Sequence, residues 1–209
     1  MNGADKRLRS GSQGRSRLHA AASGYGESEM RKLLLFVLVC CWWNTAAFAA
    51  PRTSLLTCDL GSGYKATLLG EAHGIEGKVL FLDINGNVEK AFLDFPDASL
   101  VGNVVLAKCV DHVLVFAMNY GPPYLKGMAV RFNADTSRIE QINFSEKSLP
   151  SWIYTNPRSL LVVFPNKGHE SNKRFVVYQF VAGEGQGEEP EGFDTLPKRV
   201  GYKAIRVRH

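Results

Sequence analysis

The pattern of apolar and polar positions predicts the secondary structure of most of this chain. Between residues 54 and 208, apolar runs of five to eight residues alternate with short clusters of Gly, Asn, Asp and Pro. Several runs are apolar at every second position, as at Met128, Val130 and Phe132, which places these side chains on one face of a β-strand. No stretch keeps helical spacing for three turns. The predicted strands are 54–60, 63–70, 78–83, 88–95, 102–109, 112–119, 127–132, 138–144, 151–155, 160–165, 174–180 and 202–208. Short strands at this close spacing are typical of an all-β fold.

Comparison of the chain with itself predicts an internal duplication. Residues 80–95 align with 129–144 at an offset of 49, and residues 116–132 align with 164–180 at an offset of 48. Repeats of this length with four strands each are the size of β-propeller blades. Twelve strands make only three blades, however, and a closed propeller has at least about four. We therefore favour an antiparallel meander of 10–12 short strands, folded as a barrel or sandwich. A partial propeller of blade-like four-stranded units is the alternative.

Residues 30–49 have the organisation of a signal peptide. A basic start at 30–32 precedes an apolar run at 33–43, and Ala47-Phe48-Ala49 supplies the small residues that signal peptidase accepts. We expect cleavage after Ala49, export to the periplasm or extracellular space, and a single all-β domain over 50–209. The apolar run is shorter than the roughly 20 residues that span a bilayer, so no stable membrane span is expected after processing. Residues 1–29 are predicted to be a non-native or disordered extension. The alternative is that the whole leader, including residues 30–49, is a transit peptide.

Removing this leader changes the charge and the cysteine count. Residues 1–49 carry 7 of the 25 basic and 3 of the 20 acidic residues, so the rest of the chain carries 18 and 17. A net charge of +1 gives no reason to expect nucleic acid or an anionic membrane as a partner. Only Cys58 and Cys109 remain, and two cysteines in an exported chain predict a disulfide.

The segment 81–92 raises the question of a metal site. Asp83, Asn85 and Asn87 sit at alternate positions, as oxygen ligands do at the start of a calcium loop. In that loop, however, glycine occupies position 6 and glutamate position 12, whereas Gly86 here is at position 4 and Asp94 at position 12. Asn-Gly between apolar runs is the stronger signal for a tight hairpin turn. We therefore predict a turn here, and neither a metal nor a cofactor anywhere in the chain.

Two pairs of aromatic residues are candidates for ligand binding. Tyr120 and Tyr124 flank two prolines in the loop 119–127, which stiffens the backbone beneath them. Trp152 and Tyr154 alternate along a strand and so share one face. Packing against the core is the alternative for both pairs, and the more economical one. The acidic, glycine-rich segment 183–194 is predicted to be a solvated excursion between the last two strands.

The sequence carries no recognisable catalytic set. A Gly-x-Ser-x-Gly motif is absent, and paired cysteines are poor nucleophiles. We therefore expect a non-enzymatic binding or interaction protein with a protein, small-molecule or glycan ligand. One alternative is a secreted glycan hydrolase, because two catalytic carboxylates need not be close in sequence. Another is a self-associating subunit, a homo-oligomer that completes a ring through a sheet edge.

Overall fold

The structure is a computed structural model, and it describes residues 51–74, 77–93, 101–121, 123–168 and 172–208. The predicted signal peptide and the residues before it lie outside these ranges. The chain divides between Phe48 and Ala49, and residues from Ala49 to His209 form one compact unit. Every regular element in the described residues is a strand, and none of them belongs to a helix that could cross a membrane.

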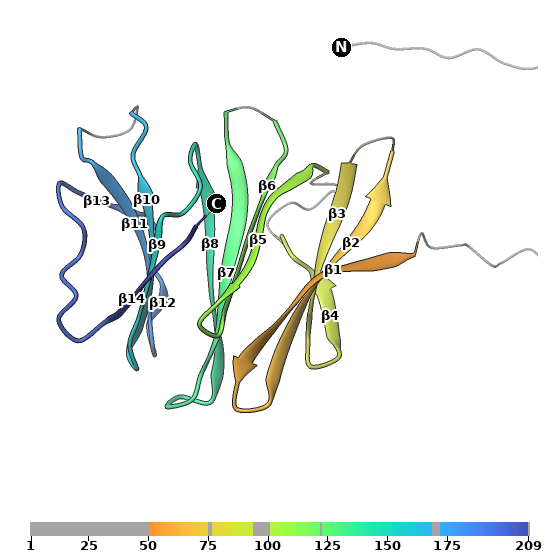
Figure 1. Cartoon of the computed structure of the whole chain (residues 1–209), viewed down its shortest axis with the longest axis horizontal. Helices are drawn as coiled ribbons and strands as arrows, with labels where there is room; N and C mark the ends of the chain where they lie inside the picture. Colours follow the sequence, from red (N-terminus) through yellow and green to blue (C-terminus); the bar gives the residue numbers. More distant parts are fainter. Residues whose placement is uncertain (1–50, 75–76, 94–100, 122, 169–171, 209) are drawn as a thin grey trace, which may run out of the picture. The chain divides into compact units, whose positions relative to one another are not determined.

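The strands form three antiparallel sheets that follow one another along the chain (Figure 1). The first, sheet A, has the order β1-β2-β3-β4. Its strands are β1 (Arg52–Gly61), β2 (Tyr64–His73), β3 (Gly77–Ile84) and β4 (Asn87–Lys90). Sheet B has the order β5-β6-β7-β8. Its strands are β5 (Asn103–Val110), β6 (Val113–Asn119), β7 (Leu125–Asn133) and β8 (Arg138–Glu146).

Sheet C has the order β12-β11-β10-β9-β14, and β13 also pairs with β11. Its strands are β9 (Trp152–Thr155), β10 (Ser159–Pro165), β11 (Phe175–Val181), β12 (Gly185–Gln186), β13 (Glu191–Phe193) and β14 (Lys203–Arg206). The last strand therefore returns to pair with the first strand of its own sheet.

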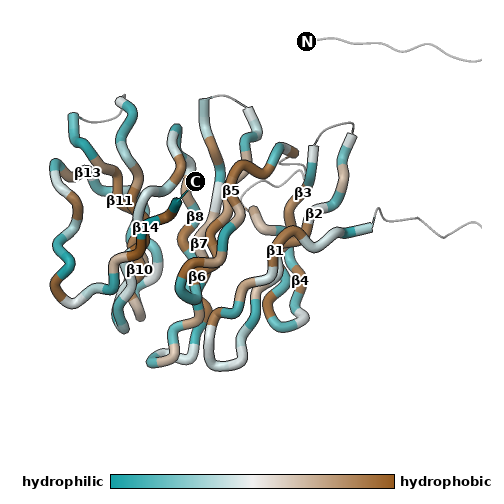
Figure 2. The backbone as a smooth tube through the Cα atoms, viewed as in Figure 1, coloured by the Kyte–Doolittle hydropathy of each residue, from teal (hydrophilic) through white to brown (hydrophobic). Residues whose placement is uncertain are grey.

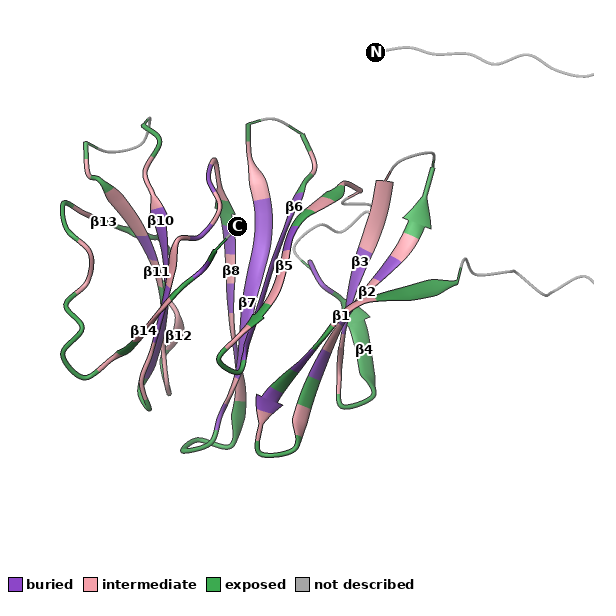
Figure 3. Cartoon of the chain, in the orientation of Figure 1, coloured by how far each residue is buried: buried purple, intermediate pink, exposed green. Residues whose placement is uncertain are grey.

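The sheets stack face to face because sheet B is apolar on both of its faces. In β6, Leu114, Phe116 and Met118 belong to the core shared with sheet A. The intervening residues of β6, Val113, Val115 and Ala117, belong to the core shared with sheet C. All six are at most 1% exposed, so the central strand shows an unbroken apolar run rather than an alternation (Figures 2 and 3).

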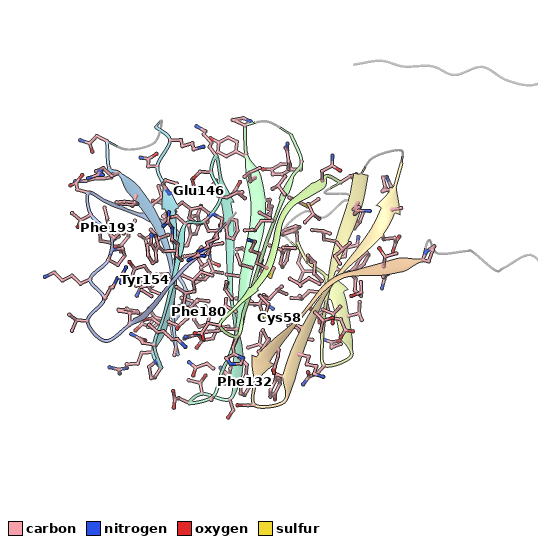
Figure 4. The ribbon with its side chains drawn as sticks, in the orientation of Figure 1. Cys58, Phe132, Glu146, Tyr154, Phe180 and Phe193 are labelled. Carbon is pink, nitrogen blue, oxygen red and sulfur yellow. A yellow bond between two sulfur atoms is a disulfide. The ribbon has the colours of Figure 1, made fainter. Side chains whose placement is uncertain are left out.

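A third apolar cluster lies on the outer face of sheet C. It is built on four residues of β9, β10 and β11, namely Tyr154, Leu161, Val163 and Val177. The segment that follows β11 packs on this face through Phe193, Leu196, Tyr202 and Ala204. Figure 4 shows Tyr154 and Phe193 in this part of the molecule. The end of the chain thus covers a sheet face that would otherwise expose large apolar side chains to water.

The predicted all-β, antiparallel meander is confirmed, and the stacked sheets make it sandwich-like. Within the described ranges the sheets do not close into a barrel. All twelve predicted strands correspond to observed ones, whereas β12 and β13 lie in the segment 183–194 that was expected to be a solvated excursion. That expectation was wrong in part, because the backbone of this segment pairs with β11.

The aligned repeats occupy corresponding places in their sheets. Residues 80–95 contain the end of β3 and all of β4, and residues 129–144 contain most of β7 and β8, which are likewise the third and fourth strands of a sheet. This correspondence agrees with blade-like units. A common origin of the sheets by duplication stays a prediction.

Two local predictions are confirmed by the structure. Asn85 and Gly86 form a two-residue turn with φ of 51° and 90°, and the Asp83 carboxylate accepts the Gly86 N–H at 2.7 Å. The sulfur atoms of Cys58 and Cys109 are 2.04 Å apart and form a disulfide. The disulfide ties β1 of sheet A to β5 of sheet B, so it joins two layers of the stack.

Candidate functional site

An open cleft of about 530 Å³ lies where the edge of sheet B meets sheet C. On one side it is lined by Thr136, at the β7–β8 turn, and by the start of β8 (residues 138–140). On the other side it is lined by Phe180, near the end of β11, and by the connection to β12 (residues 182–185). We call this cleft the β8 groove. Figure 1 shows β8 as the strand of sheet B that is labelled nearest to β9 and β12.

The strand β8 is an edge strand, so half of its backbone groups point away from its partner β7. Hydrogen bonds show which residues of β8 carry these outward backbone groups. The Asn143 N–H donates to the Gln186 side-chain oxygen at 2.8 Å, and the Gln186 side-chain N–H donates to the Asn143 carbonyl at 2.7 Å. At Ser145, the Tyr178 hydroxyl lies 3.5 Å from the backbone nitrogen and 3.3 Å from the carbonyl oxygen. The outward groups of Asn143 and Ser145 are therefore covered by side chains of sheet C.

The first half of the same edge is different. The register between β7 and β8 has no irregularity, so the backbone groups of Ile139 and Gln141 point outward like those of Asn143. No hydrogen bond to these outward groups occurs within the described ranges. Ile139 lines the groove, and Gln141 follows it at the next outward position along the edge. The groove is thus the place where β8 has an uncovered edge.

Apolar and charged side chains both line the groove. Phe180 is half-buried and packs on the core between sheets B and C (Figure 4). Glu184 and Arg138 are exposed at its margin. The small residues at 182, 183 and 185 leave room beside Phe180 for a side chain of a ligand. Among the described residues no group of three or more His, Cys, Asp or Glu is arranged to hold a metal ion.

The third charged residue, Glu140, is part of a buried network. Its Oε2 accepts the Arg131 Nε–H at 2.6 Å, and its Oε1 accepts an Asn133 side-chain N–H at 2.7 Å. Arg131 and Asn133 also donate to the carbonyls of Asn156 and Pro157 in the β9–β10 turn, at 2.9 and 2.7 Å. The network therefore fastens the edge of sheet B to the first turn of sheet C.

The Glu140 carboxylate is fully engaged by neighbouring residues of the protein. Both oxygens of Glu140 are engaged, and the Glu140 side chain is only 2% exposed. The second Arg131 nitrogen, Nη2, also lies 2.6 Å from Oε2, although its direction does not make a hydrogen bond. A carboxylate held in this way is not free to attack a substrate or to transfer a proton to it.

A second hollow of about 510 Å³ adjoins the segment between β12 and β13. It is lined by alternate residues of β11 and by four glutamates, which are Glu184, Glu188, Glu189 and Glu191. Glu184 and Gly185 line both hollows. Of the four glutamates, only Glu184 also lines the β8 groove.

The four aromatic residues that the sequence predicts as ligand-binding candidates lie in two different parts of the structure. Tyr154 is completely buried, and Trp152 lies beside it on the same face with ring centroids 6.4 Å apart, as the alternation predicted. Tyr120 and Tyr124 are half-buried at the β6–β7 connection, where the Lys147 Nζ lies 5.0 Å from the centroid of the Tyr124 ring. None of the four lines the β8 groove. Their role in ligand binding stays a prediction, and for Tyr154 it would require the covering segment to move away.

The residues of the groove carry little signal in the sequence. An uncovered strand edge follows from the stacking of the sheets, and no local pattern marks it. Gln186 lies in a glycine-rich acidic segment, and only its pairing with Asn143 gives it a role.

Comparison with models of protein families, with curated proteins and with solved structures finds no match to this chain.

Proposed function

We propose that this chain is an exported, non-enzymatic binding protein that takes its ligand in the β8 groove. The observation that carries the proposal is the coincidence of a hollow of about 530 Å³ with an uncovered stretch of sheet edge. A binding site needs a concave surface with a few polar groups in fixed directions. Here the polar groups belong to the backbone of β8, which is held in place by its pairing with β7, so their directions are fixed without any ligand.

Export rests on the signal-peptide pattern at 30–49 and is supported by the disulfide. A disulfide that joins two sheets is compatible with an oxidising compartment outside the cytoplasm. Cleavage after Ala49 would make Ala50 the first residue of the mature protein. Mass spectrometry of protein recovered from the periplasm or medium tests this, since an intact leader or two free thiols in the recovered protein would contradict export.

A glycan hydrolase is the second candidate, because two carboxylates, Glu140 and Glu184, line the same groove. Glycosidases place their two carboxyl groups roughly 5–10 Å apart across the bond they cleave. The engaged state of Glu140 argues against this use of the pair. A Glu184→Gln variant tests it, because a glycosidase that uses Glu184 as its acid would lose turnover of chromogenic glycosides while keeping its fold.

The binding proposal is tested by filling the groove. Ala182 is half-buried in the wall, and Ala182→Trp would place an indole in the hollow. The matched control is Ala72→Trp, at an exposed position of sheet A. The full chain and both variants would be applied to a glycan array and to a display library of random linear peptides. We expect ligands that bind the parent chain and the control but lose at least tenfold in affinity with Ala182→Trp. Equal binding to all three proteins, or no binding to either collection, would refute the proposal.

A further inference from the structure

We infer that the ligand of the β8 groove is an extended polypeptide segment that adds to β8 as a further strand of sheet B. This inference rests on the proposed function, and it names the class of ligand and the way it is held. The segment would form backbone hydrogen bonds with the outward N–H and C=O groups of Ile139 and Gln141.

The spacing of the free groups fits a polypeptide. Outward groups recur at every second residue of a strand, so those of Ile139 and Gln141 lie about 6.8 Å apart along the edge. A second strand repeats its own donors and acceptors at the same interval, so it satisfies both residues together. A ligand whose donors and acceptors do not repeat at this interval satisfies only one of the two residues.

The protein itself shows how this edge is satisfied one position further on. The Gln186 side chain both accepts from and donates to Asn143, as a peptide group of a neighbouring strand would. Side-chain amides and peptide groups have the same donor and acceptor chemistry. The edge of β8 is therefore already paired with an amide at Asn143, and a bound peptide would continue this pairing toward the start of the strand.

The walls of the groove define which side chains the segment would carry. Even-numbered residues of β8, such as Ile142 and Phe144, face sheet C, so alternate side chains of an added strand would face the same way. There they would meet Phe180 and the exposed carboxylate of Glu184. Glu140 contributes little charge because Arg131 neutralises it. We therefore expect an apolar residue and a Lys or Arg two positions apart, so that both face sheet C.

The experiment separates backbone pairing from other modes of binding. A display library of random linear dodecapeptides would be selected on the full chain, and the best-enriched peptide would be synthesised. Methyl groups would then be placed on its amide nitrogens one at a time. Amides that point toward β8 would lose at least about tenfold in affinity when methylated, because each loses a hydrogen bond and meets a steric clash. Amides that point away would tolerate the change, so the losses would alternate along the peptide.

A substitution on the protein side gives an independent readout. Gln141→Pro removes an outward N–H that makes no bond to β7, and edge strands tolerate proline at such positions. The matched control is Val88→Pro, which removes an outward N–H from the edge strand β4 of sheet A. We expect Gln141→Pro to weaken the peptide at least tenfold and Val88→Pro to leave its affinity unchanged. If Gln141→Pro fails to fold, the methylation series on the parent chain still decides the question.

The outcomes distinguish this inference from the proposed function. A peptide that loses affinity with Ala182→Trp but shows no alternating effect of methylation binds the groove without pairing to β8, and it overturns the inference alone. A glycan that loses affinity with Ala182→Trp, with no peptide enriched, does the same. Failure of every ligand to respond to Ala182→Trp overturns the proposed function as well.

Discussion

The buried pair of Arg131 and Glu140 allows a quantitative prediction of stability. Replacing Glu140 by glutamine keeps the shape of the side chain but leaves it only one acceptor oxygen. The parent carboxylate accepts from Arg131 through one oxygen and from Asn133 through the other. An amide satisfies one of these donors and turns its own N–H₂ toward the other. One buried donor therefore loses its acceptor, which costs about 1–3 kcal/mol.

The charge adds to this cost. The Arg131 side chain is 8% exposed, so the variant leaves a buried guanidinium without its carboxylate. Breaking one side of a buried ion pair costs about 3–5 kcal/mol in total. With a urea dependence of about 2 kcal/mol per molar, the unfolding midpoint would fall by roughly 1.5–2.5 M. Urea titrations of the disulfide-intact protein, followed by tryptophan fluorescence, would measure this shift.

Two controls define what would refute the reasoning. Asp194→Asn breaks an exposed pair with Lys173, whose side chains are 63% and 41% exposed, and should cost at most about 0.5 kcal/mol. Adding Arg131→Met to Glu140→Gln removes the uncompensated charge, so the double variant should be more stable than Glu140→Gln alone. A loss below about 1 kcal/mol for Glu140→Gln, or a double variant less stable than it, would show that an uncompensated buried charge is not the cause of the lost stability.

Further predictions concern the sheet interfaces and the first hairpin turn. Replacing Cys58 and Cys109 together by alanine should lower the free energy of unfolding by about 4 kcal/mol, because the sequence separation of 51 residues leaves a long loop unconstrained; calorimetry with an unchanged transition would contradict this. Gly127→Ala should destabilise the protein by at least about 2 kcal/mol in urea titrations, because the added Cβ would lie 2.4 Å from a backbone oxygen. Gly187→Ala is the control, because its added Cβ would meet no atom closer than 3.8 Å. Chelator or added calcium should leave the thermal unfolding temperature unchanged, because Asp83 uses its carboxylate within the turn; a rise with calcium would point to a metal site after all.

The order and type of the strands could be predicted because they depend on local patterns. Alternating apolar residues and turn-forming residues such as Asn85 and Gly86 act over a few positions, and both are visible in the sequence. The strands β12 and β13 escaped prediction because each is only two or three residues long and is held by pairing with β11. The aromatic residues at 120, 124, 152 and 154 stood out by composition, yet composition does not tell a buried ring from an exposed one.

The sequence by itself determined that this protein is built of antiparallel strands, that Cys58 and Cys109 are its candidates for a disulfide, and that residues 81–92 contain a tight hairpin turn. Only the tertiary structure decided how the strands group into three stacked sheets, which charges are buried together, and where a strand edge stays uncovered. The reason is physical. Local propensity acts between residues close in sequence, whereas the covering of Asn143 by Gln186 and the opening at Ile139 depend on how one sheet packs against the next.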